Sequence, residues 1–338
     1  MQVLSCTTPG LLAFAERAKP LPVKDHTLIR VRRVGVCGTD LHAFEGTQPY
    51  FTYPRVLGHE FSGIIEHTDG DPAFKAGDAV TCVPYFSCGK CIACRSGKPN
   101  CCMQVQVCGV HIDGAMADYI AVPTPALVAG QGLSMDELAL VEPFAIGAHG
   151  VKRAAIEQGE FVLVMGAGPI GLCTMQMAIQ AGGRVIALDV NAQRLSYCSS
   201  NLKLPFVING ATQDAEAALL ELTNGNMPTV VIDATGNREA ILQGFKYLAH
   251  GGRYVLVGLQ KGDIAFSHPE FHKREATLMS SRNATRADFD QVIKSRLNGE
   301  LNLAGFITHR AAYEQVPHVF ASWTKPETGV IKAIIELD

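Results

Sequence analysis

Two groups of residues in this chain have the types and spacing of metal ligands. The first is a set of four cysteines, C-x2-C-x2-C-x7-C, in a loop rich in Gly, Lys and Pro: Cys88, Cys91, Cys94 and Cys102. Four thiolates form a closed tetrahedral set for Zn²⁺, which is typical of a structural site that folds a loop without a core of its own. Cys101 competes for the fourth place, and an iron–sulfur cluster is the alternative to zinc.

The second group is dispersed and has the composition of a catalytic metal site. It comprises Cys37, the adjacent pair His59 and Glu60, and Glu142. One thiolate, one imidazole and one carboxylate would leave the fourth position of Zn²⁺ open to water or substrate. Either glutamate can supply the carboxylate, and both could do so in turn. Taken alone, Cys37 would more often be a small buried residue.

A glycine motif in the second half of the chain predicts a dinucleotide site. Residues 162–171 form an apolar segment that runs into Gly-x-Gly-x-x-Gly and then into an expected helix. Gly166 permits the turn, Gly168 lets a pyrophosphate approach the backbone, and Gly171 lets the helix pack closely on the strand. The helix N-terminus would face the phosphates. A glycine-rich packing turn is the alternative.

Asp189, at the end of the next expected strand, bears on the choice of cofactor. Its carboxylate can accept hydrogen bonds from both ribose hydroxyls of NAD, whereas it would repel the 2′-phosphate of NADP. Arg194 could stack on the adenine or be a solvated helix residue. Thr235 and Gly258 follow two further expected strands, where a parallel sheet binds its ligands, and are assigned to the nicotinamide half.

The elements around these groups divide the chain into two patterns. Residues 1 to about 125 contain short alternating strands, expected at 28–36, 61–67 and 78–83. From about residue 144, helices alternate with buried apolar strands, expected at 161–165, 184–189, 206–208, 229–233 and 253–257. This alternation predicts right-handed βαβ crossovers and a parallel sheet. A helix at 287–297 and a strand at 329–337 complete the chain.

The composition of the 338 residues excludes several classes of protein. A hydrophobic content of 47%, a charged content of 18% and 33 glycines indicate a soluble globular protein. A net charge of −3 gives no electrostatic case for nucleic acid or an anionic membrane. The uncharged stretch 161–183 could suggest a membrane span, but its glycines and proline divide it into strand, turn and helix.

The N-terminus and the cysteines favour a cytoplasmic protein. Residues 1–10 lack the basic start and apolar core of a secretory signal. Seven of the eleven cysteines lie between Cys82 and Cys108. In a reducing compartment, metal ligation explains this crowding better than disulfide bonds do.

Together these motifs resemble those of the zinc-dependent medium-chain dehydrogenases, over essentially the whole chain. The similarity rests on Cys-Gly-Thr-Asp at 37–40, Gly-His-Glu at 58–60, the four-cysteine loop and the glycine motif. Glu142 stands where typical alcohol dehydrogenases have a third ligand cysteine, as in the polyol and sugar-acid branch that includes sorbitol and threonine dehydrogenases. Within that branch, the segments that look most like L-galactonate and L-gulonate 5-dehydrogenases are 48–59, 270–275 and 281–285.

The resemblance implies an α/β fold with two parts. A GroES-like, mostly β catalytic domain would span 1–145, a Rossmann NAD-binding domain with a doubly wound parallel sheet would span 146–282, and 283–338 would return to the catalytic domain. The active cleft would lie between the domains. The family spacing favours Cys102 over Cys101 as the fourth structural ligand. Homodimers or homotetramers are usual among similar enzymes.

The implied reaction is hydride transfer to NAD from a secondary hydroxyl of a sugar acid. An aldonate such as L-gulonate or L-galactonate would be oxidised at C5 to a keto acid, for example D-fructuronate or D-tagaturonate. Zn²⁺ would lower the pKa of the hydroxyl. As the resemblance implies, Thr39 would take the hydroxyl proton and pass it through the cofactor ribose to His42. Asp40 would orient His59, unless it is only a turn residue.

A sugar acid also requires a cation for its carboxylate, and a guanidinium can bind it in bidentate fashion. Arg282 is the first candidate, with Arg55 and His272 behind it; a surface or cofactor contact is the alternative for Arg282. The competing functions are a neutral polyol, threonine or other alcohol dehydrogenase, and a non-enzymatic NAD-binding protein. The last is disfavoured because a binding module needs no open metal site.

Overall fold

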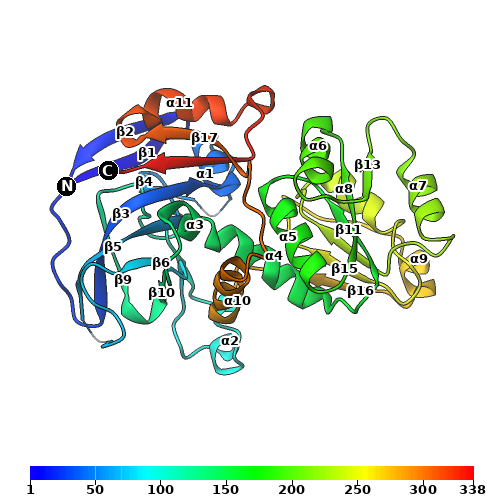
Figure 1. Cartoon of the computed structure of the whole chain (residues 1–338), viewed down its shortest axis with the longest axis horizontal. Helices are drawn as coiled ribbons and strands as arrows, with labels where there is room; N and C mark the ends of the chain where they lie inside the picture. The colour runs from blue at the N-terminus through cyan, green and yellow to red at the C-terminus, as the bar shows by residue number, and fades with distance from the viewer. Residues whose placement is uncertain (50, 70) are drawn as a thin grey trace. The chain divides into compact units, whose positions relative to one another are not determined.

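The computed structural model describes residues 1–49, 51–69 and 71–338, so Tyr50 of the segment 48–59 lies outside it. The chain divides into two compact units, each assembled from separate segments (Figure 1). Unit 1 comprises Met1–Glu142, Thr285–Leu297 and Gly305–Asp338. Unit 2 comprises Pro143–Ala284 and Asn298–Ala304.

Unit 1 is built mainly from β-strands. Its seven-stranded sheet has the order β10-β6-β5-β3-β18-β17, with β9 also paired to β3. These strands are β3 (His26–Val36), β5 (Glu60–Thr68), β6 (Ala79–Cys82), β9 (Tyr119–Pro123), β10 (Leu127–Ala129), β17 (Ile307–Ala312) and β18 (Lys332–Glu336). A three-stranded sheet and a short ribbon complete the β-structure: β1 (Gln2–Thr8), β2 (Leu11–Glu16) and β4 (Arg55–Val56), then β7 (Tyr85–Phe86) and β8 (Gln106–Val107).

The last strand of the chain lies beside one of the first (Figure 1). β18 pairs antiparallel with β3, and Ala333 stands opposite Val36. On its other side β3 pairs with β5, so that Gly35 stands opposite Glu60. Most of the buried apolar side chains of these strands belong to one hydrophobic core. The carboxyl end of β3, which leads to Cys37, is therefore held between two strands.

Short helices connect and flank the strands of unit 1. They are α1 (Gly38–Phe44), α2 (Ile92–Arg95), α3 (Met135–Ala139), α10 (Arg286–Leu297) and α11 (Val316–Trp323), with the 3₁₀ turns η1 (Pro99–Cys101), η2 (Thr124–Ala126), η3 (Tyr313–Gln315) and η4 (Pro326–Thr328). Helix α3 begins with a capping box, in which Ser134 and Glu137 satisfy each other's backbone N–H groups. Helix α1 begins directly after Cys37, and its third residue is the buried Asp40.

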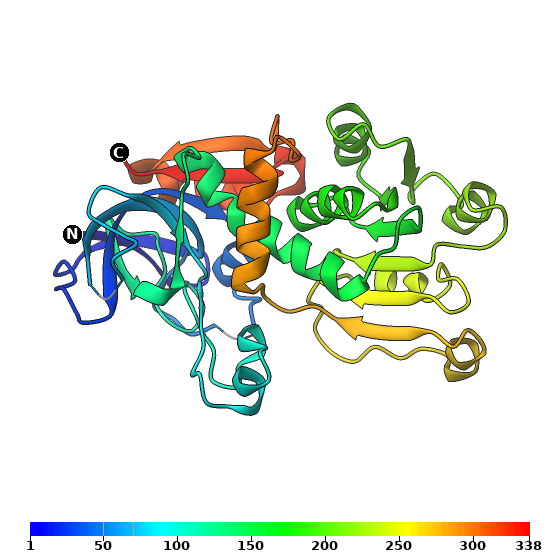
Figure 2. The same ribbon diagram turned by 60° about the horizontal axis from the view of Figure 1, so that its bottom comes forward.

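Unit 2 is a parallel sheet with the strand order β13-β12-β11-β14-β15-β16. The strands are β11 (Phe161–Met165), β12 (Arg184–Asp189), β13 (Phe206–Asn209), β14 (Val230–Asp233), β15 (Arg253–Leu256) and β16 (Thr277–Ser280). The helices are α4 (Val141–Ala154), which begins at the end of the first segment of unit 1, and α5 (Pro169–Gln180), α6 (Ala192–Ser200), α7 (Ala215–Leu222), α8 (Arg238–Gly244) and α9 (His268–Lys273). Figure 2 shows the strands side by side, with β16 at one edge.

This strand order is that of the doubly wound dinucleotide-binding sheet. The central strand β11 has no exposed apolar residue from Val162 to Met165, as expected for a parallel strand covered on both faces. The predicted fold class, a doubly wound α/β sheet with a second, mostly β part, is confirmed. The uncharged stretch 161–183 forms β11, a turn and α5. Among the described residues, no helix combines the length and apolar character needed to cross a membrane.

Candidate metal centres and cofactor site

Three of the predicted catalytic ligands come together where β3 ends and β5 begins. Cys37 follows β3, and His59 and Glu60 stand at the start of β5. One donor atom from each residue lies within 4.8 Å of the other two. His59 and Glu60 are buried, whereas Cys37 is half-buried. The pairing of β3 with β5 therefore gathers a sulfur, a nitrogen and an oxygen donor around a space of the size that one metal ion fills.

Asp40 connects the segment that carries Cys37 with the segment that carries His59. Its Oδ2 accepts a hydrogen bond from the backbone N–H of Cys37 at 2.9 Å, and its Oδ1 accepts one from Gly58 at 3.1 Å. The same Oδ1 lies 3.9 Å from Nδ1 of His59. That Nδ1 is buried and has no hydrogen-bond partner among the described residues. Because Nδ1 faces Asp40, Nε2 of His59 is the nitrogen that remains for a metal.

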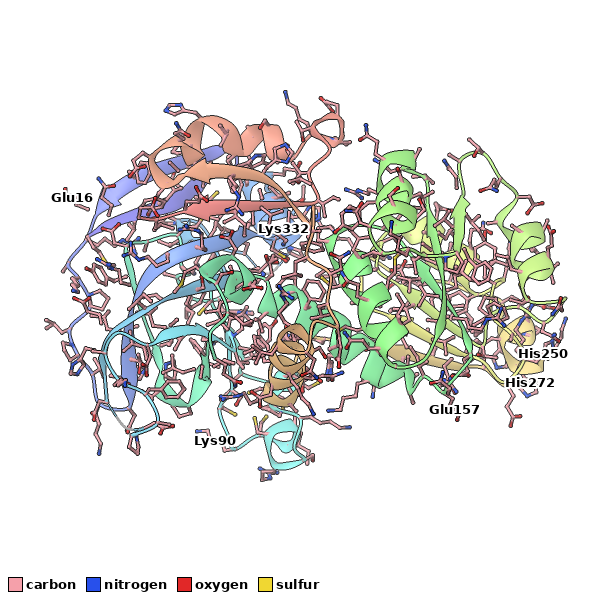
Figure 3. All side chains as sticks on the ribbon, in the orientation of Figure 1. Glu16, Lys90, Glu157, His250, His272 and Lys332 are labelled. Atoms are coloured by element: carbon pink, nitrogen blue, oxygen red, sulfur yellow. The ribbon has the colours of Figure 1, made fainter. Side chains whose placement is uncertain are left out.

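Glu60 is paired with a buried lysine that the sequence interpretation missed. Nζ of Lys332 lies 2.8 and 2.6 Å from the two carboxylate oxygens of Glu60 and donates to the carbonyl of Val36 at 3.1 Å. Neither side chain of the pair is more than 1% exposed. Figure 3 shows Lys332 on β18. A Cβ at Gly35 would lie 2.4 Å from Oε2 of Glu60, so a glycine is needed opposite this carboxylate.

Glu142 reaches the same cluster from the first turn of α4, although it is not one of the three grouped donors. The hydroxyl of Tyr85, a second residue that the sequence interpretation missed, donates a hydrogen bond to Oε1 of Glu142. Both side chains are buried. Burial raises the pKa of Glu142 to about 7, while His59 opposes and Glu60 adds to this rise. The carboxylate of Glu142 is therefore close enough to interact with both.

The charges of this cluster fit a divalent cation. Burial raises the pKa of Asp40, against the effect of His59. Burial alone would lower the pKa of His59, but the Cys37 thiol, Asp40 and Glu142 raise it well above its usual value. A thiol and several carboxyl groups withdrawn from water require a compensating positive charge, and a sulfur, nitrogen and oxygen donor set suits Zn²⁺. The residues present therefore fit the metal that the sequence predicts.

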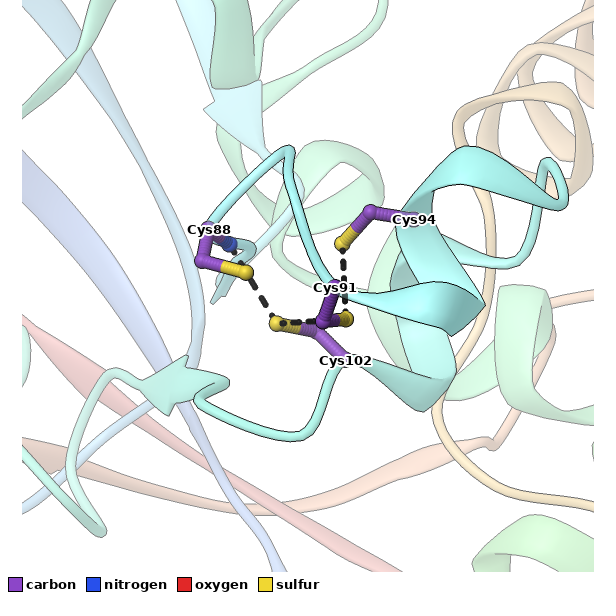
Figure 4. A group of neighbouring side chains, drawn as sticks. All are labelled: Cys88, Cys91, Cys94 and Cys102. Atoms are coloured by element: carbon purple, nitrogen blue, oxygen red, sulfur yellow. Dashed lines mark hydrogen bonds between the residues drawn. The ribbon is translucent and has the colours of Figure 1, made fainter.

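The four cysteines of the loop also form one group (Figure 4). Sγ of Cys91 lies 3.5 Å from Sγ of Cys94 and 3.9 Å from Sγ of Cys102. Sulfur atoms at the corners of a Zn–S₄ tetrahedron are about 3.8 Å apart, as follows from the Zn–S bond length. Backbone N–H groups of Cys94 and Met103 lower the pKa of Cys91 to about 6. The exposed Cys101 lies outside the group.

The glycine motif of unit 2 forms the predicted turn between β11 and α5. Gly166 has φ +94°, and a Cβ at Gly171 would lie 1.8 Å from the carbonyl oxygen of Gly166. Only glycine therefore permits the helix to start so close to the strand. At Gly168 a Cβ would meet only Nη1 of Arg194, at 3.7 Å. The backbone at Gly168 is accordingly accessible to a ligand, and Arg194 lies beside it.

Asp189 holds this turn against the end of β12. Its Oδ2 accepts a hydrogen bond from Ala167 N–H at 2.5 Å, and its Oδ1 accepts one from Asn191 N–H at 2.8 Å. Each oxygen keeps a second lone pair for another donor. Thr235 and Gly258 follow β14 and β15. The hydroxyl of Thr235 donates to Asp233 at 2.5 Å, so part of its hydrogen-bonding capacity is used within the loop.

The other predicted site residues are distributed over both units. Thr39 is half-buried on α1, and His42 is exposed on the same helix, with Nδ1 3.5 Å from Oε2 of Glu45. Arg55 lies in unit 1, where its guanidinium donates to Thr52 at 3.0 Å and lies 3.5 Å from Asp113.

The remaining two candidates for the substrate carboxylate lie in unit 2. Arg282 is exposed in the segment after β16. His272 is exposed on α9, and Figure 3 shows it near His250 at the α9 end of the unit. Neither contributes to the metal cluster of unit 1, which contains only residues of that unit.

Comparisons with known proteins identify the family. Residues 23–131 match the alcohol dehydrogenase GroES-like domain, and residues 169–297 match the model described as zinc-binding dehydrogenase. The chain is 41% identical to L-galactonate-5-dehydrogenase of Escherichia coli K12 over 336 residues, which cover 99% of this chain and 98% of that protein. The chain belongs to the zinc-binding dehydrogenase family. The predicted resemblance to zinc-dependent medium-chain dehydrogenases is thereby confirmed.

Two further relatives agree with this membership. A sorbitol dehydrogenase of Halalkalibacterium halodurans is 33% identical over 305 residues, 89% of each chain. The crystal structure of RspB from Escherichia coli CFT073 with NADH superposes with a TM-score of 0.93 at 28% identity, covering 100% of this chain and 99% of RspB. The predicted enzyme class, an NAD-dependent zinc dehydrogenase with a small-molecule substrate, is confirmed.

Proposed function

We propose that this dehydrogenase oxidises a secondary hydroxyl of a sugar acid, with NAD as hydride acceptor. The substrate would be an aldonate such as L-galactonate or L-gulonate, oxidised at C5 to D-tagaturonate or D-fructuronate. The observation that carries this proposal is the 41% identity to an L-galactonate-5-dehydrogenase over nearly the whole of both chains. Glu142 beside the metal cluster supports it, since this is the position that distinguishes the polyol and sugar-acid branch.

The catalytic zinc would be held by Cys37, His59 and Glu60, with Glu142 as a further carboxylate. A zinc ion there would polarise the substrate hydroxyl and lower its pKa. Asp40, whose Oδ1 lies 3.9 Å from Nδ1 of His59, would favour one orientation of the imidazole by its charge, and it accepts the backbone N–H of Cys37. The four-cysteine group would hold the structural zinc.

Two residues of α1, Thr39 and His42, would take part in proton transfer. Thr39 is half-buried two residues after Cys37, and its hydroxyl would accept the proton of the substrate hydroxyl. His42 lies one helical turn further on and is exposed, so its imidazole can deliver the proton to water. The two residues, with the cofactor ribose between them, would thus connect a buried hydroxyl to the solvent.

NAD would be selected through Asp189. Both carboxylate oxygens accept one backbone N–H each, which fixes the side chain while leaving lone pairs for the ribose hydroxyls. A 2′-phosphate would meet a negative charge at this point. The backbone at Gly168, in the turn that Gly166 and Gly171 permit, would receive the pyrophosphate, with Arg194 beside it.

The direct test measures NADH formation by zinc-loaded protein with L-galactonate, L-gulonate, sorbitol and threonine. We expect kcat/KM for one of the aldonates to exceed that for sorbitol and threonine by about tenfold or more, and NADP to replace NAD poorly, because Asp189 repels its phosphate. A preference for sorbitol, which the similarity to a sorbitol dehydrogenase would favour, would replace the sugar acid by a neutral polyol. If none of the four substrates is oxidised, the remaining alternative is a non-enzymatic NAD-binding protein.

Recognition of the substrate carboxylate is assigned to Arg282. We expect Arg282→Ala to raise KM for an aldonate by about 10- to 100-fold, since a charge-assisted pair contributes about 1.5–3 kcal/mol. KM for a neutral polyol of equal length should change little. Equal losses on both substrates would remove Arg282 from this role. Arg55→Ala is the comparison, because Arg55, which lies 3.5 Å from Asp113, is the weaker candidate for the same role.

The proposed location and assembly rest on the cysteines and on the sheet edges. None of the eleven cysteines is paired in a disulfide, and five of them belong to the two metal-ligand groups, so we place the protein in a reducing, cytoplasmic compartment. β13 and β16 are the edge strands of the unit 2 sheet, and an exposed edge can pair with a second copy. A homodimer or homotetramer is therefore the proposed assembly.

A further inference from the structure

Tyr85 is a buried residue to which the proposed reaction gives no role. It is the first residue of β7, and Cys88 follows two residues after the end of that strand. Its hydroxyl donates to Oε1 of Glu142, 57 positions further along the chain. One side chain thus connects the start of the four-cysteine loop with Glu142, the carboxylate that interacts with His59 and Glu60 of the catalytic cluster, entirely within unit 1.

We propose that Tyr85 is a positioning residue that holds Glu142 in one orientation toward the catalytic metal site, and that the metal-closed four-cysteine loop holds Tyr85 in place. The inference rests on the proposed catalytic zinc site. It gives the metal of the four-cysteine loop a second role, because a loop fixed by that metal would hold Tyr85, and through it Glu142, in place. Tyr85 itself contacts neither substrate nor cofactor in this account.

The orientation of Glu142 depends on its contact with Tyr85. Glu142 is 3% exposed and Tyr85 is 8% exposed, so water has little access to replace the phenol as donor. Glu60, by contrast, is paired with the cation Lys332. A phenol orients a carboxylate without neutralising its charge, whereas an ammonium does both. The Tyr85 hydroxyl therefore restricts the rotation of Glu142 without adding a positive charge that would compete with a metal ion.

The position of Tyr85 depends in turn on the loop. β7 and β8 pair through only two residues each, Tyr85 with Val107 and Phe86 with Gln106. A ribbon of this length is not stable alone. The four-cysteine group closes the loop between the two strands, with Cys88 two residues after β7 and Cys102 four residues before β8. Metal binding there would fix the distance between the ends of the ribbon.

Two further contacts restrict Tyr85. The carbonyl of Pro84 accepts a hydrogen bond from Cys108 N–H at 3.0 Å, which fixes the backbone just before the tyrosine. The ring packs edge-on against Phe289 of α10, with centroids 6.5 Å apart, and Phe289 is fully buried. Tyr85→Phe would keep this packing and remove only the hydroxyl.

The experiment uses Tyr85→Phe in the full-length protein with zinc in the loop and Co²⁺ in the catalytic site, where visible absorption reports the donor geometry. The matched control is Tyr313→Phe, because Tyr313 is another buried tyrosine of unit 1 whose hydroxyl donates, at 2.8 Å, to the backbone carbonyl of Met116 and not to a side chain of the metal cluster. We expect Tyr85→Phe to shift the Co²⁺ spectrum and to speed metal loss to a chelator by about 10- to 100-fold. Tyr313→Phe should do neither.

Coupling to the loop is tested with Cys94→Ser in the wild-type and Tyr85→Phe backgrounds. Loss of the loop metal should shift the Co²⁺ spectrum when Cys94→Ser is made in the wild-type protein. When it is made in Tyr85→Phe, the spectrum should stay that of Tyr85→Phe alone. If Cys94→Ser does not fold, Cys94→His takes its place, because it keeps four zinc donors. We then expect a smaller shift of the Co²⁺ spectrum, which should again be absent in the Tyr85→Phe background.

The outcomes separate this inference from the proposed function. A wild-type protein that binds no Co²⁺ at the Cys37 site would contradict the proposed function itself. Co²⁺ bound with the same spectrum and release rate in wild type and Tyr85→Phe would overturn the positioning role of Tyr85. Equal spectral shifts from the Cys94 variant in both backgrounds would overturn the link to the loop.

Discussion

Cys37→Ser is expected to remove the catalytic zinc and to lower kcat/KM by about a thousandfold or more, because the proposed site loses its only thiolate and the metal that activates the hydroxyl. The protein should still fold. Cys37 is the N-cap residue of α1, and serine is a better N-cap than cysteine, so the helix that carries Asp40 should persist. Zinc content and initial rates, measured on the same purified protein, check the prediction.

Cys101→Ser is the control for this experiment. Cys101 is exposed and lies outside both metal groups, so its loss should change neither zinc content nor rate. A Cys37→Ser protein that keeps all its zinc and its activity would remove Cys37 from the metal site. Loss of zinc from the four-cysteine loop instead would show that the two sites had been wrongly separated.

Five of the six strands of the unit 2 sheet could be predicted from the sequence almost residue by residue, whereas the largely exposed edge strand β16 (Thr277–Ser280) was missed. β11 and β12 have the bounds expected from their apolar runs, 161–165 and 184–189. Strands covered on both faces consist of consecutive apolar residues, and glycines or acidic residues mark their ends, so composition alone defines them. The glycine motif was predictable for a similar reason, because the close contact between Gly166 and Gly171 excludes any side chain.

Helix α1 could not be predicted in this way. It has seven residues, too few for a helical pattern to be recognised, and it exists because Asp40 bonds to the backbone of Cys37 and Gly58. The expected role of Asp40 as the partner of His59 did not require the helix. Spacing gave the residue types of the site, whereas the local backbone that presents them depends on hydrogen bonds between distant segments.

The residues that contact the two candidate carboxylates, Glu60 and Glu142, were also not predicted from the sequence. Glu60 and Lys332 are 272 positions apart and meet only because β18 pairs with β3. A signal did exist for Lys332, since a single lysine within the apolar run 330–335 requires a buried partner. Tyr85 offered none, because a tyrosine between Pro84 and Phe86 is ordinary core composition. The choice between Glu60 and Glu142 therefore depended on contacts that spacing does not contain.

Lys332→Met is expected to lower the free energy of unfolding of the zinc-free protein by about 3–5 kcal/mol, the usual cost of removing one partner from a buried ion pair. Methionine fills much of the space of the lysine, but it leaves the carboxylate of Glu60 buried without a cation. The single tryptophan of the chain, Trp323, lies in α11 of unit 1 and reports the unfolding of that unit by fluorescence during denaturation.

The controls for this variant distinguish charge from packing. Lys325→Met removes an exposed lysine close to Trp323 in sequence and should change stability by less than about 0.5 kcal/mol. Adding Glu60→Gln to Lys332→Met should recover much of the loss, because the unpaired charge is gone. Saturating zinc should also reduce the penalty of Lys332→Met, since a metal ion bound by Glu60 would replace the missing cation. A penalty that neither Glu60→Gln nor zinc reduces would mean that Lys332 acts through packing alone, and that Glu60 is not a ligand.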